Sequence, residues 1–281
     1  MTGCVACGGL LRTWRGDVDV CRSCGTSSRK GRFGASERES HYASYYEAIP
    51  PLSPLTAARL KAWTGWLSLY RRTGRTLEVG CGAGHFLTAA EAAGFEAWGT
   101  EIAVSALERL RARGFRVLGG NLPDLQLPAE HFDAVILFEV LEHLDDPLTY
   151  LLEARRVVRQ GGALLLTTPN FNSLSRRLLG DRWRVVDPEH LILFTPSGLR
   201  IALERAGFRV VSIWSRNVDP TELVRVLHGK PVRGTEERQR GVDACRERLA
   251  AGSGLLVLRE VVNLGLRALG LGDTCEARAE R

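Results

Sequence analysis

The stretch "LEVGCGAGHFL" at residues 77–87 decides the fold of this chain. Its apolar start predicts a strand at 76–80, and the residues after it predict a helix at 84–93. Glycines between the two let the backbone come close to a ligand, and the helix start offers unpaired N–H groups. A dinucleotide fingerprint reads G-x-G-x-x-G, and Gly84 stands one residue too early for its third glycine. The stretch therefore predicts a ligand-binding strand–turn–helix without the full dinucleotide fingerprint.

Strands and helices alternate around this stretch, which is typical of a parallel sheet with crossover helices. Further strands are predicted at 96–100, 115–118, 133–138, 163–168 and 209–214, and helices at 54–72, 103–113, 147–159 and 196–206. Thr195 and Pro196 form a start signal for the last of these helices. The terminal "DTCEARAER" at 273–281 is expected to add one more strand. The predicted fold class is α/β: a Rossmann-like, doubly wound, mostly parallel seven-stranded sheet.

An acidic residue, Glu101, ends the strand after the glycine turn. A carboxylate at that place can accept hydrogen bonds from both hydroxyls of a ribose. The competing interpretation is an acid at the N-terminus of the helix "IAVSALERL", where it would complement the helix dipole. The order strand, turn, helix, strand, acid favours the ribose role.

Five ordered motifs carry a resemblance that spans Thr76 to Trp214. They are "LEVGCGAGHFL", "GTEIA", "GNLPDLQLPAEHFDAVILFEVLEHLDDP", "RRVVRQGGALLLTTPN" and "PEHLILFTPSGLRIALERAGF". In this combination the chain resembles class I S-adenosylmethionine-dependent methyltransferases, the broad group that includes ubiquinone-biosynthesis and natural-product methyltransferases.

The resemblance implies a set of cofactor-binding residues. In the family, the glycine turn and the acid before it contact the methionine part and the ribose, and Ile102 would lie beside the adenine. The position that usually carries an Asp for the adenine amino group is Asn121 here, and its amide oxygen can accept the same hydrogen bond. The full implied set is Glu78, Gly80, Gly82, Gly84, Glu101, Ile102, Asn121, Leu122, Phe138 and Glu139, the last two on the sulfonium side.

Two histidines are candidate catalytic bases, His143 in "EVLEHLDD" and His190 in "VDPEHLILF". A hydroxyl acceptor benefits from a base whose pKa is near neutral, and histidine meets that need. Each histidine has an alternative role, in which it only pins a loop. The motif Asn/Asp-Pro-Pro-aromatic of nucleic-acid N-methylating branches is replaced by "FEVLEHL", which favours oxygen or carbon acceptors.

Four cysteines are arranged as two Cys-x-x-Cys pairs, Cys4 with Cys7 and Cys21 with Cys24. Two such turns supply the four thiolates of a tetrahedral zinc site, and the predicted ion is structural because no coordination position stays open. The alternative is four free or redox-active thiols.

The predicted domains are a zinc-ribbon-like module at 1–27, a linker with an aromatic segment at 28–52, and the methyltransferase domain at 53–281. A helical insertion is predicted within it at 218–270. The apolar face of that insertion is formed by Leu255, Leu258 and Val262. It is expected to cover the acceptor pocket or to form a homodimer contact.

Composition limits the partners. The net charge is +6 and the pI about 9.1, yet nearly all basic residues are arginines, acids are interspersed, and no long basic block occurs. This pattern indicates a solvated surface and disfavours nucleic acid. The N-terminus lacks a signal-peptide pattern, and the most apolar late segment is interrupted by charges. We expect a cytoplasmic protein with no membrane partner.

The sequence leaves three functions open. The first is an S-adenosylmethionine-dependent methyltransferase for a small-molecule acceptor (sugar, phenol or secondary metabolite), with O-methylation favoured over C-methylation. The second is an rRNA methyltransferase whose zinc module holds RNA. The third is a non-catalytic, cofactor-binding scaffold.

Overall fold

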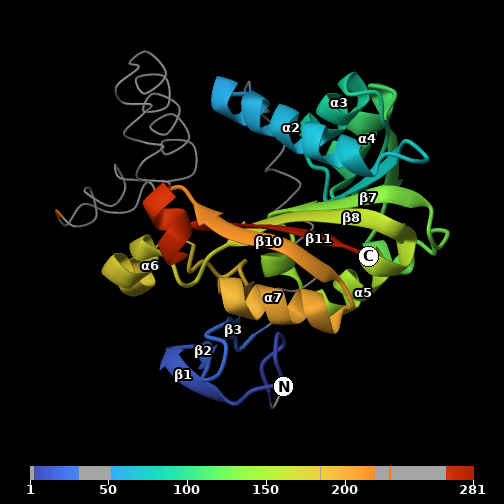
Figure 1. The fold of residues 1–281 in the computed structure, drawn as a ribbon. Helices are drawn as coiled ribbons and strands as arrows, with labels where there is room; N and C mark the ends of the chain where they lie inside the picture. The colour runs from blue at the N-terminus through green and yellow to red at the C-terminus, as the bar shows by residue number, and fades with distance from the viewer. Residues whose placement is uncertain (1–2, 32–51, 184, 219–227, 229–263) are drawn as a thin grey trace.

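A computed structural model describes residues 3–31, 52–183, 185–218, 228 and 264–281 (Figure 1). Its main element is a seven-stranded sheet in the order β10-β11-β8-β7-β4-β5-β6. The strands are β4 (Arg75–Val79), β5 (Glu96–Glu101), β6 (Arg116–Gly119), β7 (Phe132–Phe138), β8 (Val158–Pro169), β10 (Arg209–Arg216) and β11 (Thr274–Glu280). Neighbouring strands pair in parallel, except that β11 runs antiparallel to both β8 and β10. The predicted Rossmann-like, mostly parallel sheet of seven strands is confirmed.

Helices cover both faces of the sheet (Figure 1). One face carries α2 (Pro54–Leu67), α3 (His85–Ala92) and α4 (Val104–Ala112), and the other carries α5 (Pro147–Val157) and α7 (Pro196–Arg205). Each face has its own apolar core, because the buried side chains of β7 and β8 are divided between the two. The sheet is therefore doubly wound, as predicted.

Three helices begin with the same local device. A side-chain oxygen of Ser53, Asp146 or Thr195 accepts a backbone N–H three residues further on, and a proline follows in the first turn. Such a cap contributes about 1 kcal/mol, and the proline has the backbone angle that a helix start needs. The predicted start of the helix at 196 is confirmed.

Two predicted boundaries are wrong. The helix from residue 54 ends at Leu67 instead of 72, and a 3-10 turn, η1 (Ser68–Tyr70), follows it. The helix from 147 ends at Val157, and β8 begins directly at Val158, five residues before the predicted strand. Within this strand Gly161 adopts φ +67°, and a shift in the β7–β8 register accommodates it.

A second sheet joins the N-terminal module to the larger domain. It contains β1 (Leu11–Arg15), β2 (Val18–Cys21), β3 (Ser27–Arg29) and β9 (Ile192–Leu193), in that order. Strand β9 lies just before α7, so a short segment from far along the chain completes the sheet of the module. Neither β9 nor the short helix α6 (Leu174–Leu179) was predicted from the sequence.

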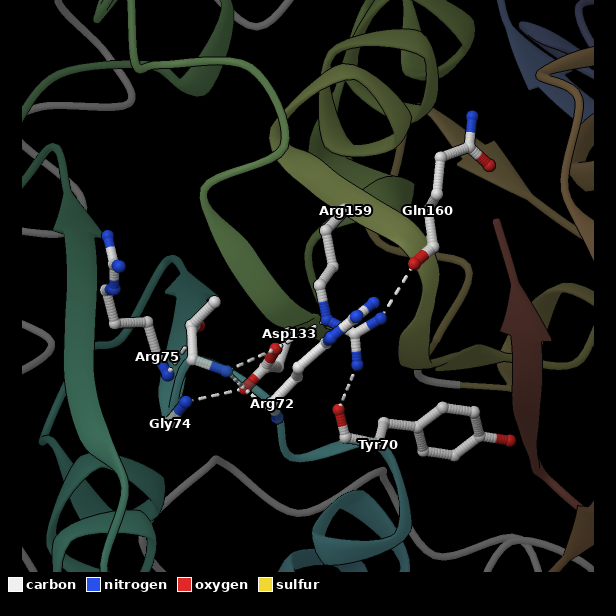
Figure 2. Close-up of polar contacts among 8 residues, drawn as sticks. Tyr70, Arg72, Gly74, Arg75, Asp133, Arg159 and Gln160 are labelled. Carbon is white, nitrogen blue, oxygen red and sulfur yellow. Dashed lines mark hydrogen bonds and ion pairs between the residues drawn. The ribbon is translucent and has the colours of Figure 1, made fainter.

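A buried carboxylate, Asp133, fastens the N-terminal ends of the parallel strands (Figure 2). It is fully buried at the start of β7 and accepts the backbone N–H groups of Arg72, Thr73 and Gly74, at 2.7–3.0 Å. The guanidinium of Arg159 donates to the same carboxylate at 2.7 Å and also to the carbonyl of Tyr70. This network holds the turn before β4 against β7 and β8.

Several sequence predictions concern residues outside the described part of the chain. They include positions 32–51 of the linker and aromatic segment, and the apolar face of Leu255, Leu258 and Val262. The insertion predicted at 218–270 lies between β10 and β11, and its end at 264–269 is helical.

Candidate functional site

The glycine turn after β4 depends on conformations that other residues rarely adopt. Gly80, Gly82 and Gly84 have φ angles of +68°, +49° and +73°. A Cβ atom on Gly84 would lie 2.4 Å from a methyl of Leu110, and one on Gly80 would lie 3.0 Å from Val140. The turn therefore requires glycine for its backbone angles and, at Gly84, also for space.

Glu101 closes this turn from the end of β5. It is 4% exposed, and its Oε2 accepts the N–H of Gly82 at 2.8 Å. Its Oε1 accepts the N–H groups of Ile102 and Ala103, both at 2.8 Å. A carboxylate offers about four acceptor positions, so the three backbone bonds leave capacity for a ligand hydroxyl. Glu101 thus fixes the backbone of residues 102 and 103, just before α4, and also shapes the turn.

Glu78 is a second buried acid at this edge, two residues before Gly80. It is 5% exposed, and its Oε2 has no hydrogen-bond partner among the described residues. Burial, and then the negative charge of Glu101, raise the pKa of Glu78 well above its ordinary value. An unpaired buried carboxyl oxygen beside a glycine turn fits a ligand that brings a cationic donor, such as the ammonium group of S-adenosylmethionine.

The predicted adenine contacts differ in how available they are. Ile102 is 41% exposed, so its side chain is accessible to a ligand ring. Asn121 is exposed, and its amide oxygen already accepts the hydroxyl of Tyr150 at 2.9 Å. That oxygen has a second acceptor position. Leu122 is completely buried, so its side chain belongs to the core of the domain.

The end of β7 carries the next predicted pair. Phe138 stacks on Trp63 of α2, with ring centroids 4.3 Å apart, and meets the edge of Phe86. Glu139 follows with φ +54°, a left-handed conformation that is costly for a non-glycine residue and that clusters at functional sites. Part of the Glu139 side chain is exposed to solvent. Neighbouring protein nevertheless removes water from its carboxyl group, and this desolvation raises the pKa of Glu139.

Sequence reasoning missed a neighbouring acid, Glu142. It is fully buried in the 3-10 turn η3 (Leu141–His143), and its Oε2 accepts the hydroxyl of Thr168 at 3.0 Å. Burial and the charge of Glu139 raise the pKa of Glu142 well above its ordinary value. The available signal was its position three residues after Glu139 in "FEVLEH", which places both carboxyls near the same strand end.

The two predicted histidines lie together. The ring centroids of His143 and His190 are 4.8 Å apart. Nδ1 of His143 donates to the carbonyl of Glu189 at 3.2 Å, and Nδ1 of His190 donates to the carbonyl of Val185 at 2.7 Å. A carbonyl oxygen only accepts, so each Nδ1 carries the proton and each Nε2 carries the basic lone pair.

Among the residues that the structure describes, two groups of side chains have the composition and spacing of metal sites. In the first, ligand atoms of Glu142, His143 and His190 lie within 4.8 Å of one another. The second consists of the four N-terminal cysteines, whose sulfur atoms meet the same limit.

The cysteine group fits zinc by geometry. Cys4 Sγ lies 3.6 Å from Cys24 Sγ, and Cys7 Sγ lies 3.4 Å from Cys21 Sγ. Four thiolates about 2.3 Å from one ion lie roughly 3.8 Å apart, close to these values. Backbone N–H groups of Gly9, Ser23 and Cys24 point to the sulfurs of Cys7 and Cys21, at 3.4–3.5 Å, and would stabilise their thiolate forms.

Hydrogen bonds attach the loops that carry the four cysteines to helix α7. The carbonyl of Cys24 accepts the hydroxyls of Thr195 and Ser197, which lie at the start of α7. Arg205, at the other end of α7, donates to the carbonyls of Val5 and Ala6 at 2.9 and 2.8 Å. The module therefore has a defined position on the domain.

The site residues outside the module gather at one edge of the sheet. The glycine turn, Glu101 and Glu139 all follow the carboxyl ends of parallel strands. Strand β4 pairs with β5 on one side and β7 on the other, and the strand order reverses there. Open α/β sheets bind their ligands outside such a switch point. In the described part of the chain no helix is long and apolar enough to cross a membrane.

Comparisons with known proteins agree with this arrangement. The family described as "Methyltransferase domain" matches residues 54–213, more than half of the chain. A probable S-adenosylmethionine-dependent methyltransferase of Mycolicibacterium smegmatis is 35% identical over 179 residues, which span 58% of this chain and 68% of that protein. A ubiquinone biosynthesis O-methyltransferase of Rhodopseudomonas palustris is 26% identical over 168 residues, 58% of this chain and 59% of that protein.

Solved structures agree on the fold. A S-adenosylmethionine-dependent methyltransferase from Archaeoglobus fulgidus superposes with a TM-score of 0.55 at 23% identity, covering 81% of this chain and 93% of that one. The family match supplies the activity that this shared fold alone does not. The chain therefore belongs to the methyltransferase-domain family and is an S-adenosylmethionine-dependent methyltransferase.

Proposed function

We propose that this enzyme methylates an oxygen atom of a small molecule, such as a sugar, a phenol or another secondary metabolite. The observation that carries the proposal is the adjacent pair of His143 and His190, each with its basic Nε2 defined by a bond at Nδ1. A hydroxyl acceptor needs a group that takes its proton, and imidazole works near neutral pH. This requirement favours O-methylation over C-methylation.

The cofactor would be held at the switch point of the sheet. Bound S-adenosylmethionine supplies a methyl group that its sulfonium has already activated. Glu78 would accept a hydrogen bond from the ammonium group, and Glu101 would accept a ribose hydroxyl, with the three glycines giving the backbone close access. The other proposed contacts are Ile102, Asn121 and Leu122 on the adenine side, with Leu122 through its backbone, and Phe138 and Glu139 on the sulfonium side.

The protein's share of the reaction is positioning and one proton transfer. Trp63 and Phe138 form a rigid aromatic stack beside the acids that follow β7. Holding two reactants in line accounts for a large part of the rate enhancement in such displacements. The hydroxyl proton would pass to Nε2 of one histidine, which leaves the acceptor oxygen able to take the methyl group.

We infer that Cys4, Cys7, Cys21 and Cys24 hold one structural zinc ion. Their spacing matches a tetrahedral site, and four thiolates leave no coordination position for a water. A module of this size buries too little apolar surface to fold alone, so the metal would stabilise it. A zinc content of one per chain in the purified protein tests the assignment.

The charges of the module disfavour RNA as the acceptor. Arg15 pairs with Asp181, Arg29 with Asp17 and Lys30 with Asp19. Basic groups that are already paired release fewer counterions from a phosphate backbone. Membership of a family of enzymes disfavours the alternative of a non-catalytic, cofactor-binding scaffold. A cytoplasmic location remains part of the proposal, and the homodimer contact concerns residues outside the described part.

The decisive experiment combines turnover and cofactor binding in His143→Ala, His190→Ala and the double variant. Acceptors would be sought with labelled S-adenosylmethionine among phenols and sugars, with rRNA as a parallel arm. Loss of the base is expected to lower kcat about 10²–10⁴-fold while calorimetry shows unchanged cofactor affinity. Near-normal rates in all three variants would contradict the base, and methylation of rRNA alone would contradict the small-molecule acceptor.

A further inference from the structure

Arg29, at the end of β3, connects the N-terminal module with the loop that carries His190. Its backbone N–H donates to the carbonyl of Leu191 at 2.8 Å, and its guanidinium donates to the carbonyl of Asp187 at 3.2 Å. The backbone N–H of His190 donates to the same Asp187 carbonyl at 3.0 Å. Arg29 thus contacts the chain on both sides of His190 and shares one acceptor with it.

The position of Arg29 is set by the module itself. Its backbone lies opposite Val18 in the β2–β3 ladder, and its guanidinium pairs with Asp17. The Arg29 side chain is only 13% exposed, although its partner Asp17 is 51% exposed. Cys21 ends β2 and Cys24 lies in the turn before β3, and both belong to the cysteine group.

The loop at 185–191 also rests on the module through an apolar contact. Val185, whose carbonyl accepts Nδ1 of His190, packs against a small core. That core combines Val20 of β2 and Trp14 of β1 with Phe171, Leu179, Trp183 and Leu193. The loop therefore has a polar support from Arg29 and an apolar support to which β1 and β2 contribute Trp14 and Val20.

The same loop orients the second histidine. Nδ1 of His143 donates to the carbonyl of Glu189, and the N–H of Leu191 donates to the carbonyl of Glu142, next to His143. A displacement of residues 187–191 would therefore alter the hydrogen bonds that define both imidazole rings. The support that Arg29 gives to this loop acts on His143 and His190 together.

We propose that Arg29 is a positioning residue that fixes the orientation and tautomer of the His143–His190 pair, so that the N-terminal module completes the acceptor side of the methyltransferase. The consequence for catalysis rests on the proposed function, because it requires one of the histidines to act as base. The structural part concerns only the two rings and can be measured without an acceptor.

The experiment compares Arg29→Ala with Arg29→Lys and with Arg15→Ala as a matched control. Arg15 lies on the same module and pairs with the exposed Asp181, so its loss removes an equal charge without touching the loop. Long-range ¹H–¹⁵N spectra of the imidazoles report the tautomer of each ring. Arg29→Ala is expected to move the His190 and His143 signals toward a mixture of tautomers, while Arg15→Ala leaves both signals unchanged.

Arg29→Lys keeps the charge but lacks the planar fork that reaches two acceptors, so it should restore the spectrum partly. In turnover, Arg29→Ala is expected to lower kcat on the order of ten- to a hundred-fold with cofactor affinity unchanged, since misplacement of about 1 Å can cost that much. Unchanged imidazole signals in both Arg29 variants would overturn the proposal. Altered signals in an enzyme that tolerates loss of both histidines would uphold the positioning and refute the proposed base.

Discussion

The two ends of the parallel strands both bury carboxyl groups, with opposite results. Asp133 at the N-terminal end is inaccessible, and burial alone would raise its pKa, yet hydrogen bonds from Arg72, Thr73, Arg159 and Gly74 hold the pKa below its ordinary value. Glu78 at the carboxyl end is almost as buried, and its pKa is raised. The difference is the number of donors, because burial penalises a charge only where hydrogen bonds do not replace water.

The comparison separates stability from function within one sheet. A carboxylate with a full set of donors contributes to folding and leaves little acceptor capacity for a ligand. An acid with an unpaired oxygen costs stability, and such sites are where ligands and catalysis are expected. Glu101 lies between the two cases, since it serves the glycine turn and retains acceptor capacity.

The largest loss of stability should come from Asp133→Asn, which breaks the hydrogen-bond network at the N-terminal ends of the strands. The amide would present N–H groups to a ring of donors and leave Arg159 without its carboxylate, and breaking such a buried pair costs about 3–5 kcal/mol. Denaturant unfolding measures this loss, with the exposed Glu91→Gln as control. A loss below about 1 kcal/mol would show that the network is replaceable by water.

The stability that Asp133 contributes depends on pH with a definite sign. The pKa of Asp133 is lower in the folded state, so its stabilisation is present above the unfolded value of about 3.9 and is lost as pH falls through the folded value. The wild-type protein should therefore lose stability over that acidic range. Asp133→Asn should lack this component of the acid transition.

A smaller change in free energy is expected from Glu101→Gln. It tests the acid that both holds the glycine turn and retains acceptor capacity for a ligand. The variant keeps one acceptor oxygen but loses the charge that strengthens the bond to a ribose hydroxyl, a difference of about 1.5–3 kcal/mol. Calorimetry should show a cofactor Kd raised about 10- to 100-fold, whereas the exposed Glu108→Gln should bind normally. An unchanged Kd would remove Glu101 from the ribose contact and leave it a purely structural acid.

The smallest effect, and the one opposite in sign, concerns Glu78→Gln. The folded-state pKa is raised, so the penalty for the ionised carboxyl is absent below the unfolded value and grows as pH rises through the folded value. Removing the charge should stabilise the ligand-free protein by ~1 kcal/mol at pH 8 and weaken cofactor binding. Thermal unfolding at pH 5 and pH 8 checks the first part. Lower stability at pH 8 would mean that Glu78 is paired in the folded state.

Local patterns predicted most of the larger sheet. The glycine turn, the alternation of elements and the Thr195–Pro196 start are all encoded by residues close in sequence, so the seven strands and five main helices could be placed. The paired strands also brought the predicted acids and glycines to one edge, because parallel strands share their carboxyl ends. The specific contacts of each predicted site residue with a cofactor remain predictions.

Long-range partners could not be predicted. Strand β9 has two residues and no periodic pattern, and its pairing with β3 links Ser27 to Leu193. The support of His190 by Arg29 depends on that pairing. Glu142 was overlooked because a charged residue in a turn suggests exposure, whereas this one is fully buried.

The pairing of β3 with β9 also determines the order in which the chain can assemble. Strand β3 leaves the ribosome more than 160 residues before its partner, as the separation between Ser27 and Leu193 shows. At a synthesis rate of roughly 5–20 residues per second, the β3 edge of the N-terminal sheet stays unpaired for about 8–30 seconds until β9 is made. An unpaired edge is a site for pairing with other chains during that interval. Early capture of zinc by the four cysteines would keep the first strands compact while synthesis continues.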